Sequence, residues 1–509
     1  MKNHNLYRLF ESRFARVMDK VVLTTESGRQ YTYRELHHRS AQYAGYFRRS
    51  GIKPGDRVLV QVEKSPENLF SYLGCLRAGA VYVPLNPAYQ QSELAYFMQD
   101  ADPALFICDP DKEAVAELSA EGRVRIETLD NRGRGTLYER SQDEPDALDT
   151  APCAADDTAV ILYTSGTTGK PKGAMLTHGN LAANGDTLQQ LWGFTADDVL
   201  LHMLPIFHVH GLFFASHCVL LSGAGMYFLP KFSVDHIERY LPLSTMLMGV
   251  PTYYTRMLAD ARFTRDLCRN VRLFVSGSAP LLEQTFADFY EHTGEYILER
   301  YGMTETGINT SNPLVGTRKP CTVGLPLPGV QARIVDDADR PLGVGEIGHI
   351  QIRGANVFKG YWRNPEKTAE SFTADGFFRT GDTGHIDAEG YVTISGRARD
   401  LIITGGLNVY PKEIELLLDS VDGVVESAVI GLPHPDYGEA VTAVVCKRNG
   451  SDVTEAELIN ALRNTIAHFK VPKKVFFIDE LPRNTMGKVQ KNVLRERFRD
   501  AYQPLGMPG

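Results

Sequence analysis

The hydrophobic positions along the first part of the chain follow two alternating periods. Apolar residues at helical spacing follow Thr32 and Glu35, a capping-box pair that predicts a helix reaching about Arg49. Ser65 and Pro66 predict the start of a second helix, with serine as the cap and proline in the first turn. Between and after them, the pattern predicts a further helix at 92–100 and strands at 57–62, 80–85 and 104–108. This alternation is typical of parallel α/β layers.

The pattern changes twice further along the chain. Residues 125–157 are polar and predict a variable connection, after which the α/β pattern continues to about residue 310. Short strands separated by Gly, Pro and Asp-Gly turns predict a small antiparallel β unit over 315–395. A compact α+β pattern follows, with helices near 411–419 and 454–467 and strands near 424–431, 440–446 and 474–478. The predicted fold class is therefore α/β and multi-lobed, with a body over 1–396, a hinge at 397–400 and a C-terminal domain over 401–509.

Composition limits the possible partners and the compartment. The 509 residues carry a net charge of −8, which argues against a nucleic-acid partner. The seven cysteines are scattered without a CxxC pair, as in a protein of a reducing compartment without a zinc cluster or a disulfide framework. The most apolar window, 211–230, contains His217, glycines and serines, so we expect buried core and not a membrane span. We therefore predict a cytoplasmic protein that does not bind a membrane.

The stretch 163–173, Tyr-Thr-Ser-Gly-Thr-Thr-Gly-Lys-Pro-Lys-Gly, follows an apolar strand-like run. Its glycines let backbone N–H groups approach a ligand, and its hydroxyls and lysines complete a site for a polyanion. The spacing of Gly166 and Gly169, with Pro171 behind Lys170, differs from a Walker A loop. The alternative is a surface turn. As a site, the stretch predicts a nucleoside triphosphate bound by Thr164, Ser165, Gly166, Thr167, Thr168, Gly169 and Lys172.

The whole string resembles the phosphate loop of the adenylate-forming superfamily, which includes acyl-CoA synthetases, peptide-synthetase adenylation domains and firefly-type luciferases. The resemblance implies the adenylate-forming enzyme fold, with an N-terminal AMP-binding domain and a smaller mobile C-terminal domain. It also implies ATP and Mg²⁺ as ligands and small molecules as the reaction partners.

A second motif, Glu299-Arg300-Tyr301-Gly302-Met303-Thr304-Glu305, is similar to another motif of that superfamily. A tyrosine ring can stack on adenine, and a carboxylate suits Mg²⁺. The resemblance implies that Tyr301 covers adenine, that Thr304 contacts the α-phosphate, and that Glu305 holds the metal together with Thr164. It further implies nucleotide contacts for Glu299 and Ala279 and acyl-pocket positions for Ser276 and Met303. The residues alone also fit an ordinary loop after a strand.

Two more motifs complete the series. Asp382, in Thr-Gly-Asp, resembles the carboxylate that holds the ribose hydroxyls, and Arg397 reaches the ribose or a phosphate in the same resemblance. Lys488, in Asn-Thr-Met-Gly-Lys, resembles the catalytic lysine that enters the site for the first half-reaction and leaves it when the C-terminal domain rotates. Asp400 resembles the pivot of that rotation. The implied reaction joins a carboxylic acid to AMP, releases pyrophosphate and then transfers the acyl group to the thiol of coenzyme A.

The acid is indicated by a narrower resemblance, to bacterial malonyl-CoA synthetases. It lies in Leu-Pro-Ile-Phe-His-Val-His-Gly (204–211), in Leu-Met-Gly-Val-Pro-Thr-Tyr-Tyr-Thr-Arg-Met (247–257) and in Asn-Thr-Ser-Asn-Pro (309–313). Arg256 is the predicted ligand of the second carboxylate of malonate or methylmalonate, because a guanidinium binds carboxylates bidentately. His208 is the predicted gate beside the acyl carbonyl. A solvated Arg256 and a core His208 are the alternatives.

Other functions stay open at this point. The chain could activate a different short, medium-chain or aryl acid, or load a carrier protein as a stand-alone adenylation enzyme. The superfamily also contains luciferase-like oxygenases. A non-catalytic nucleotide-binding scaffold is opposed by the presence of Lys488, Glu305 and Asp382.

Overall fold

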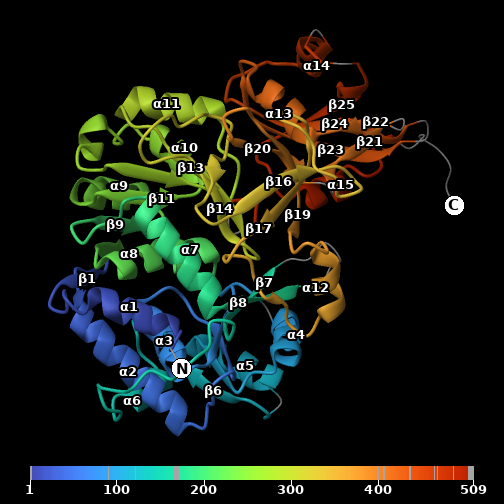
Figure 1. The fold of residues 1–509 in the computed structure, drawn as a ribbon. Coiled ribbons are helices and arrows are strands. Elements are labelled where there is room, and N and C mark those ends of the chain that lie inside the picture. The colour runs from blue at the N-terminus through green and yellow to red at the C-terminus, as the bar shows by residue number, and fades with distance from the viewer. Residues whose placement is uncertain are drawn as a thin grey trace.

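A computed structural model describes residues 3–502, apart from 90, 121, 165–170, 398–399, 405–406, 435–436, 464, 467 and 485–486. The described chain forms a large body, a small β unit and a C-terminal domain (Figure 1). The fifteen α-helices among the described elements are α1 (Leu6–Phe14), α2 (Tyr33–Arg49), α3 (Pro66–Ala78), α4 (Gln91–Ala101), α5 (Glu113–Ala120), α6 (Thr136–Ser141), α7 (His178–Leu191), α8 (Ser216–Ser222), α9 (Val234–Tyr240), α10 (Pro251–Leu258), α11 (Glu283–Thr293), α12 (Pro365–Ser371), α13 (Pro411–Asp419), α14 (Glu455–Arg463) and α15 (Lys491–Arg497).

Two mostly parallel sheets build the body. The first has the order β15 (Leu325–Pro326), β14 (Gly307–Ser311), β13 (Leu298–Met303), β12 (Leu273–Ser276), β11 (Met246–Gly249), β9 (Val199–His202), β10 (Gly225–Phe228), β1 (Val21–Thr24) and β2 (Gln30–Thr32). The second has the order β18 (Gly360–Tyr361), β8 (Lys172–Thr177), β7 (Thr158–Thr164), β4 (Val81–Pro84), β3 (Arg57–Gln61), β5 (Leu105–Cys108) and β6 (Arg125–Thr128). The predicted alternation of strands and helices is thereby confirmed.

The largest buried cluster joins the two sheets through the helices between them. Its members include Phe10 of α1, Leu69 of α3 and Leu188 of α7, together with Val60 of β3 and Leu200 of β9. Burial of large apolar side chains is the main stabilising contribution to such a body. The apolar window 211–230 forms part of this core as a π-helical turn (His210–Ala215), α8 and β10, as expected. Among the described helices, none combines the length and apolarity that crossing a membrane requires.

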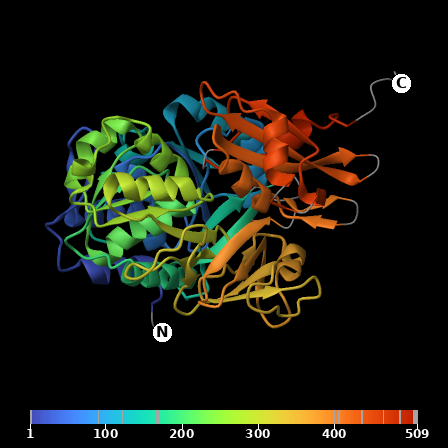
Figure 2. The ribbon, with the colours of Figure 1, turned by 90° about the horizontal axis from the view of Figure 1, so that it is seen from above.

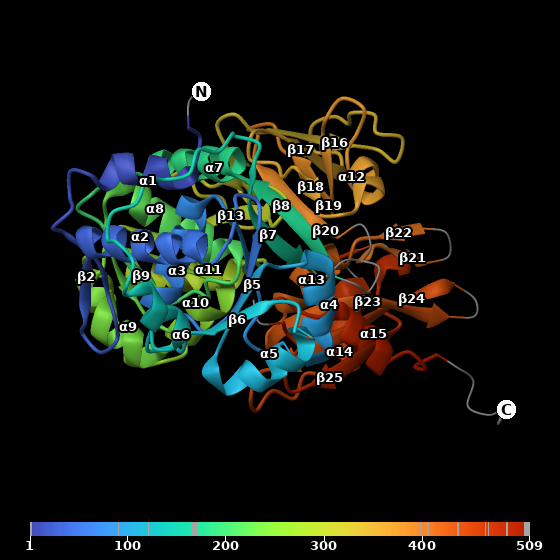
Figure 3. The same cartoon turned by 90° about the horizontal axis from the view of Figure 1, so that it is seen from below.

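The small β unit and the C-terminal domain also follow the sequence pattern. Antiparallel strands β16 (Gln331–Val335), β17 (Gly348–Arg353), β19 (Phe378–Ile386) and β20 (Val392–Arg397) form the unit predicted over 315–395. The C-terminal sheet contains β21 (Ile402–Thr404), β22 (Leu407–Val409), β23 (Val424–His434), β24 (Gly438–Lys447) and β25 (Lys474–Ile478). Figures 2 and 3 show this domain against the body, on the side where β7 and β8 lie.

Capping explains why the N-terminal helices could be located from sequence. Thr32 and Glu35 form the predicted reciprocal capping box at the start of α2. The Ser65 side chain accepts a hydrogen bond from the backbone of α3, and Pro66 is its first residue. The expectation for 125–157 was wrong in part. Strand β6 and helix α6 lie within this polar segment, because β6 pairs with β5 and places buried Glu127 beside Arg140 and Tyr46.

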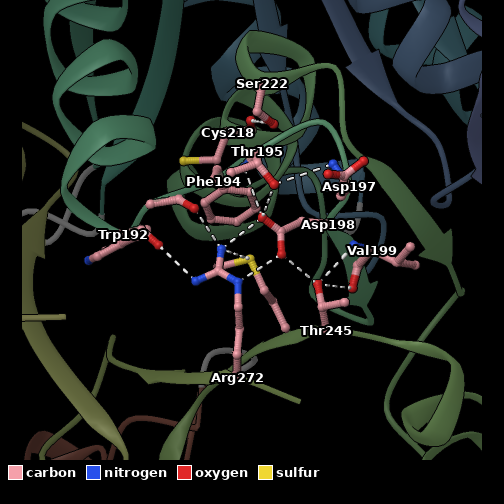
Figure 4. Close-up of polar contacts among 12 residues, drawn as sticks. Trp192, Phe194, Thr195, Asp197, Asp198, Val199, Cys218, Ser222, Thr245 and Arg272 are labelled. Atoms are coloured by element: carbon pink, nitrogen blue, oxygen red, sulfur yellow. Dashed lines mark hydrogen bonds and ion pairs between the residues drawn. The ribbon is translucent and has the colours of Figure 1, made fainter. Parts of the chain in front are cut away.

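A polar clamp fixes the starting edge of three neighbouring parallel strands (Figure 4). The carboxylate of Asp198, just before β9, accepts bonds from Nε and Nη2 of Arg272 at 2.8 and 2.7 Å. It also accepts a bond from the hydroxyl of Thr245, just before β11, at 2.7 Å. Arg272 precedes β12, so one carboxylate ties three strand ends together. The opposite, carboxyl ends of these strands are thereby held in register, and ligands of parallel α/β sheets bind at that edge.

Candidate functional site

The phosphate loop connects two antiparallel strands at the centre of the molecule. Thr164 ends β7 and Lys172 begins β8, and the two residues pair across the hairpin. The predicted ligands Ser165, Gly166, Thr167, Thr168 and Gly169 lie outside the described residues. The hairpin is anchored from α4, since the hydroxyl of Tyr96 donates to the carbonyl of Pro171 at 2.6 Å and Tyr163 donates to Asp100 at 2.6 Å.

The two predicted metal ligands come together although they are far apart in sequence. The hydroxyl of Thr164 lies 3.5 Å from Oε1 of Glu305. Tyr361 donates to the same carboxylate oxygen at 3.1 Å, which fixes its orientation. Lys172 lies close by, and its pKa is lowered by burial and by the nearby charge of Lys367, against the opposing effect of Glu305. A hydroxyl, a carboxylate and an ammonium group thus face the end of the phosphate loop.

The predicted nucleoside residues also meet. The phenolic hydroxyl of Tyr301, on β13, donates to Oδ2 of Asp382, on β19, at 2.5 Å. Asp382 is buried, and Arg397 pairs with it across β19 and β20, which places both predicted ribose residues at one position of the β unit. Thr304 and Met303 lie half-buried where β13 turns into β14. Ala279 lies in the half-buried loop after β12.

Glu299 is buried beneath this loop. Its carboxylate accepts a bond from the backbone N–H of Leu281 at 3.2 Å. Burial raises the pKa of Glu299 to about 8, against the lowering effects of that hydrogen bond and of the charges on Lys412 and Arg300. Lys412 belongs to α13 of the C-terminal domain, so the electrostatics of this carboxyl group couple the two domains.

Several buried polar atoms lack a protein partner in the region predicted to hold the acyl group. His208, His210 and Ser276 each leave one side-chain atom without a hydrogen bond within the described structure, and Arg300 leaves both Nε and Nη2. His208 and Arg300 both lie close enough to His210 to lower its pKa, and Ser276 directly precedes Gly277. The hydroxyl of Ser278 is 3.2 Å from Nδ1 of His210, and a Cβ placed on Gly277 would lie 2.5 Å from Cζ of Arg300. Buried polar atoms without a partner are uncommon in folded proteins, so this group is a candidate site for a polar ligand.

The two histidines and the arginine of this group differ in protonation state. Burial lowers the pKa of His208 to about 4 and holds the pKa of His210 well below its usual range, with Arg300 adding to the effect at His210. Both rings are therefore neutral at pH 7. Burial lowers the pKa of Arg300 to about 9, against the charges of Tyr254 and Glu299, so its guanidinium remains cationic. An unpaired buried cation is costly, and an anionic ligand would offset that cost.

The sequence motifs indicated Arg256 and did not single out Arg300. The structure places Arg256 on the exposed face of α10, whereas Arg300 is 4% exposed and lies within β13. A signal for Arg300 was available, because consecutive charged residues rarely occur in a buried parallel strand unless they bind something. The role predicted for Arg256 stays a prediction, and its side chain is exposed in this structure.

The loop of Lys488 reaches the body beside this pocket. Gly487 has a positive φ of 74°, and a Cβ placed on it would lie 3.5 Å from Oγ1 of Thr252 and 4.0 Å from Cγ2 of Val250. Val250 follows β11, and Gly249 accepts a backbone bond from Gly277 at 3.3 Å. The C-terminal domain therefore inserts the Lys488 loop next to the residues that line the acyl pocket.

Comparison with known families agrees with this geometry. Residues 10–362 match the model of the AMP-binding enzyme family, and residues 413–488 match the model of the AMP-binding enzyme C-terminal domain. This chain belongs to the AMP-binding enzyme family. The predicted resemblance and the adenylate-forming fold with a separate C-terminal domain are thereby confirmed. The prediction of an AMP-forming acid–thiol ligase is confirmed as well.

Three relatives match over most of this chain. A malonate–CoA ligase from Arabidopsis thaliana is 35% identical over 97% of this chain and 89% of its own. A mitochondrial malonate–CoA ligase, ACSF3, from Mus musculus is 36% identical over 94% of this chain and 89% of its own. A feruloyl-CoA synthase from Amycolatopsis is 35% identical over 96% of this chain and 98% of its own. Overall identity to these AMP-binding enzymes thus does not distinguish between acids.

Among solved structures, ATP-bound MatB from Rhodopseudomonas palustris superimposes with a TM-score of 0.97. It is 51% identical over 99% of this chain and 100% of its own. The apo form of MatB, with the same identity and coverage, gives a TM-score of 0.86. This AMP-binding enzyme therefore superimposes more closely on the ATP-bound form of MatB than on the apo form.

Proposed function

We propose that this enzyme activates malonate with ATP and transfers the malonyl group to coenzyme A, which gives malonyl-CoA, AMP and pyrophosphate. The observation that carries the proposal is the buried guanidinium of Arg300, with two unpartnered nitrogens in the acyl pocket. A second carboxylate of the substrate would pair with it bidentately. An aryl or fatty acid would leave the cation unpaired and desolvated.

The chemistry needs no enzyme nucleophile. One carboxylate oxygen of malonate attacks the α-phosphorus of ATP, the bond to the β-phosphate oxygen breaks, and pyrophosphate leaves. The thiol of coenzyme A then loses its proton and attacks the acyl carbonyl, and AMP leaves with the electron pair of the carbon–oxygen bond. Both steps bring anionic or electron-rich groups together, so positioning and charge neutralisation dominate catalysis.

The residues of this chain divide that work. Arg300, His208 and Ser276 hold the acid, and Tyr301 and Asp382 hold the nucleoside. Lys488 supplies positive charge to the reacting carboxylate and α-phosphate from the loop that touches Thr252. Thr164 and Glu305 offer the hard oxygen ligands that suit Mg²⁺, which would neutralise phosphate charge when bound. Asp400 remains the proposed pivot between the half-reactions.

The substrate preference tests this proposal directly. The purified enzyme is given ATP, Mg²⁺ and coenzyme A with malonate, methylmalonate, acetate, benzoate or ferulate, and both pyrophosphate release and thioester formation are measured. We expect the highest kcat/KM for malonate or its methyl derivative. A higher value for a monocarboxylic acid would replace the proposed substrate while leaving the ligase chemistry in place.

The compartment also remains a proposal. We infer a cytoplasmic enzyme from the scattered cysteines, although one similar malonate–CoA ligase is named as mitochondrial. Imaging the tagged full chain in its native cell would decide between the two.

A further inference from the structure

The hairpin that carries Lys488 has its own internal bonds. Arg483 and Val489 form an isolated antiparallel bridge, and the N–H of Asn484 donates to the carbonyl of Lys488 at 2.9 Å. The side-chain oxygen of Asn484 accepts from the N–H of Lys488 at 2.9 Å. Since Gly487 lies close to Thr252 of the body, the direction of this hairpin decides where Lys488 can reach.

One ion pair fastens the first side of the hairpin to the C-terminal sheet. Nη2 of Arg483 contacts the carboxylate of Glu426 on β23, and Nη1 of the same guanidinium donates to the carbonyl of Gly487 at 2.6 Å. Both side chains are about three-quarters buried, with 23% and 21% of their surfaces exposed. One planar guanidinium therefore links β23 to the residue next to Lys488, which a lysine could not do with the same geometry.

A second ion pair fastens the other side. Lys491, the first residue of α15, lies 2.6 Å from Oε1 of Glu415 on α13. Glu415 also accepts a bond from the N–H of Val429 at 2.9 Å. Although burial opposes it, the charges of Lys491 and Lys412 and these hydrogen bonds lower the pKa of Glu415, so the carboxylate is ionised at pH 7. The hairpin is thus held at both of its ends by charged pairs.

We propose that the pairs Arg483–Glu426 and Lys491–Glu415 position Lys488 for adenylate formation and contribute nothing to thioester formation. The inference rests on the proposed role of Lys488 in the first half-reaction. The apolar core of this domain lies on the two faces of the sheet, among residues such as Val429, Val441 and Leu458 on one side and Ile430, Val444 and Leu494 on the other. Arg483 and Lys491 flank the hairpin, and their partners Glu426 and Glu415 belong to β23 and α13, so the two pairs tie the hairpin to the packed part of the domain.

The test separates the two half-reactions in the full-length enzyme. Adenylate formation is measured by malonate-dependent exchange of pyrophosphate into ATP, and thioester formation is measured from chemically prepared malonyl adenylate and coenzyme A. For Glu426→Gln we expect exchange to fall by roughly 10- to 100-fold and thioester formation to stay within about 3-fold. Glu426→Asp should recover part of the exchange rate. Lys488→Ala serves as the reference: it should reduce pyrophosphate exchange more strongly than Glu426→Gln does and likewise leave thioester formation nearly unchanged.

The matched control is Arg448→Gln, which breaks the exposed pair of Arg448 and Asp422 in the same domain and should change neither half-reaction. Equal losses in both half-reactions, or no loss in either, would overturn the proposed positioning role. If the wild-type enzyme shows no exchange with malonate, the proposed substrate fails instead. The acid that does support exchange then replaces malonate in the same comparison of variants.

Discussion

At the scale of single residues, two arginines show what a sequence can and cannot reveal about this site. Arg256 stood in a motif that indicated an acyl pocket, but its side chain is exposed on α10. Arg300 stood inside the nucleotide motif, and only the fold shows its guanidinium packed against Gly277 with unpartnered nitrogens. Which side of an element faces a pocket is a tertiary property, so motif membership alone does not decide between Arg256 and the proposed Arg300.

Replacing Arg300 by Leu should lower kcat/KM for malonate by roughly 100-fold, about 3 kcal/mol, because a buried charge-assisted pair is lost. The KM for ATP should change by less than about 3-fold, since the nucleotide contacts lie elsewhere. Short monocarboxylic acids should become better substrates, which a general structural defect would not cause. Steady-state kinetics with malonate and butyrate measure both effects.

Arg256→Ala is the matched control for this experiment and should leave malonate kinetics within about 2-fold of wild type. The opposite ranking, with Arg256 sensitive and Arg300 tolerant, would restore the assignment made from the sequence alone.

Glu299 gives a second prediction at this scale, through the pH dependence of stability. Its folded pKa of about 8 lies above the usual value for an exposed carboxyl group, so the folded state retains a proton that the unfolded state has lost. This contribution to stability is complete below the unfolded pKa and is lost as the pH rises through about 8. Glu299→Gln should therefore raise the melting temperature at pH 8.5, by roughly 2–5 °C, and by much less at pH 5.

Scanning calorimetry of the ligand-free variant and wild type between pH 5 and pH 8.5 measures this difference. A constant difference over that range would mean that Glu299 is ionised in the folded protein throughout.

At the scale of elements, local signals located the helices α2, α3, α4, α13 and α14 and the long strands β23 and β24. The caps of α2 and α3 were visible because capping depends on residues three apart in sequence. By contrast, β8 is a six-residue strand that pairs with β7 across a loop, and α15 is a seven-residue helix with few apolar residues. Neither was predicted, because short elements of this kind are stabilised by tertiary contacts and not by their own propensity.

The clamp at Asp198 gives a prediction for elements (Figure 4). Asp198→Ala should reduce the stability of the body by about 2–4 kcal/mol, because Arg272 and Thr245 lose the carboxylate that joins three strand ends. Thermal unfolding should show a lower melting temperature while the KM for malonate and ATP changes little, since the site lies at the other ends of these strands. A large change in KM with normal stability would contradict a purely structural clamp.

At the scale of the whole molecule, the sequence indicated two domains and a hinge but not their relative arrangement. The close approach of Gly487 to Thr252 brings together residues from different domains, and no local pattern encodes it. The ion pair of Asp400 with Arg495 of α15, at 2.7 Å, is a further example, since it connects the predicted hinge to the helix that follows Lys488. Side-chain contacts of this kind belong to one conformation of the enzyme.

That conformation can be trapped by joining the two domains where they touch. Cys321 is first replaced by Ser, because it is the one cysteine of the described chain that is not buried. Thr252→Cys and Gly487→Cys are then added, and the two new thiols are linked with a short thiol-reactive cross-linker. The linked enzyme should form adenylate and release about one pyrophosphate per molecule, then stop, because the C-terminal domain cannot rotate away for the thiol. A cleavable reagent should restore turnover when the link is cut. As a control, linking Asp422→Cys with Arg448→Cys inside one domain should leave turnover intact. Full turnover by the enzyme linked between residues 252 and 487 would instead show that both half-reactions proceed in this single arrangement.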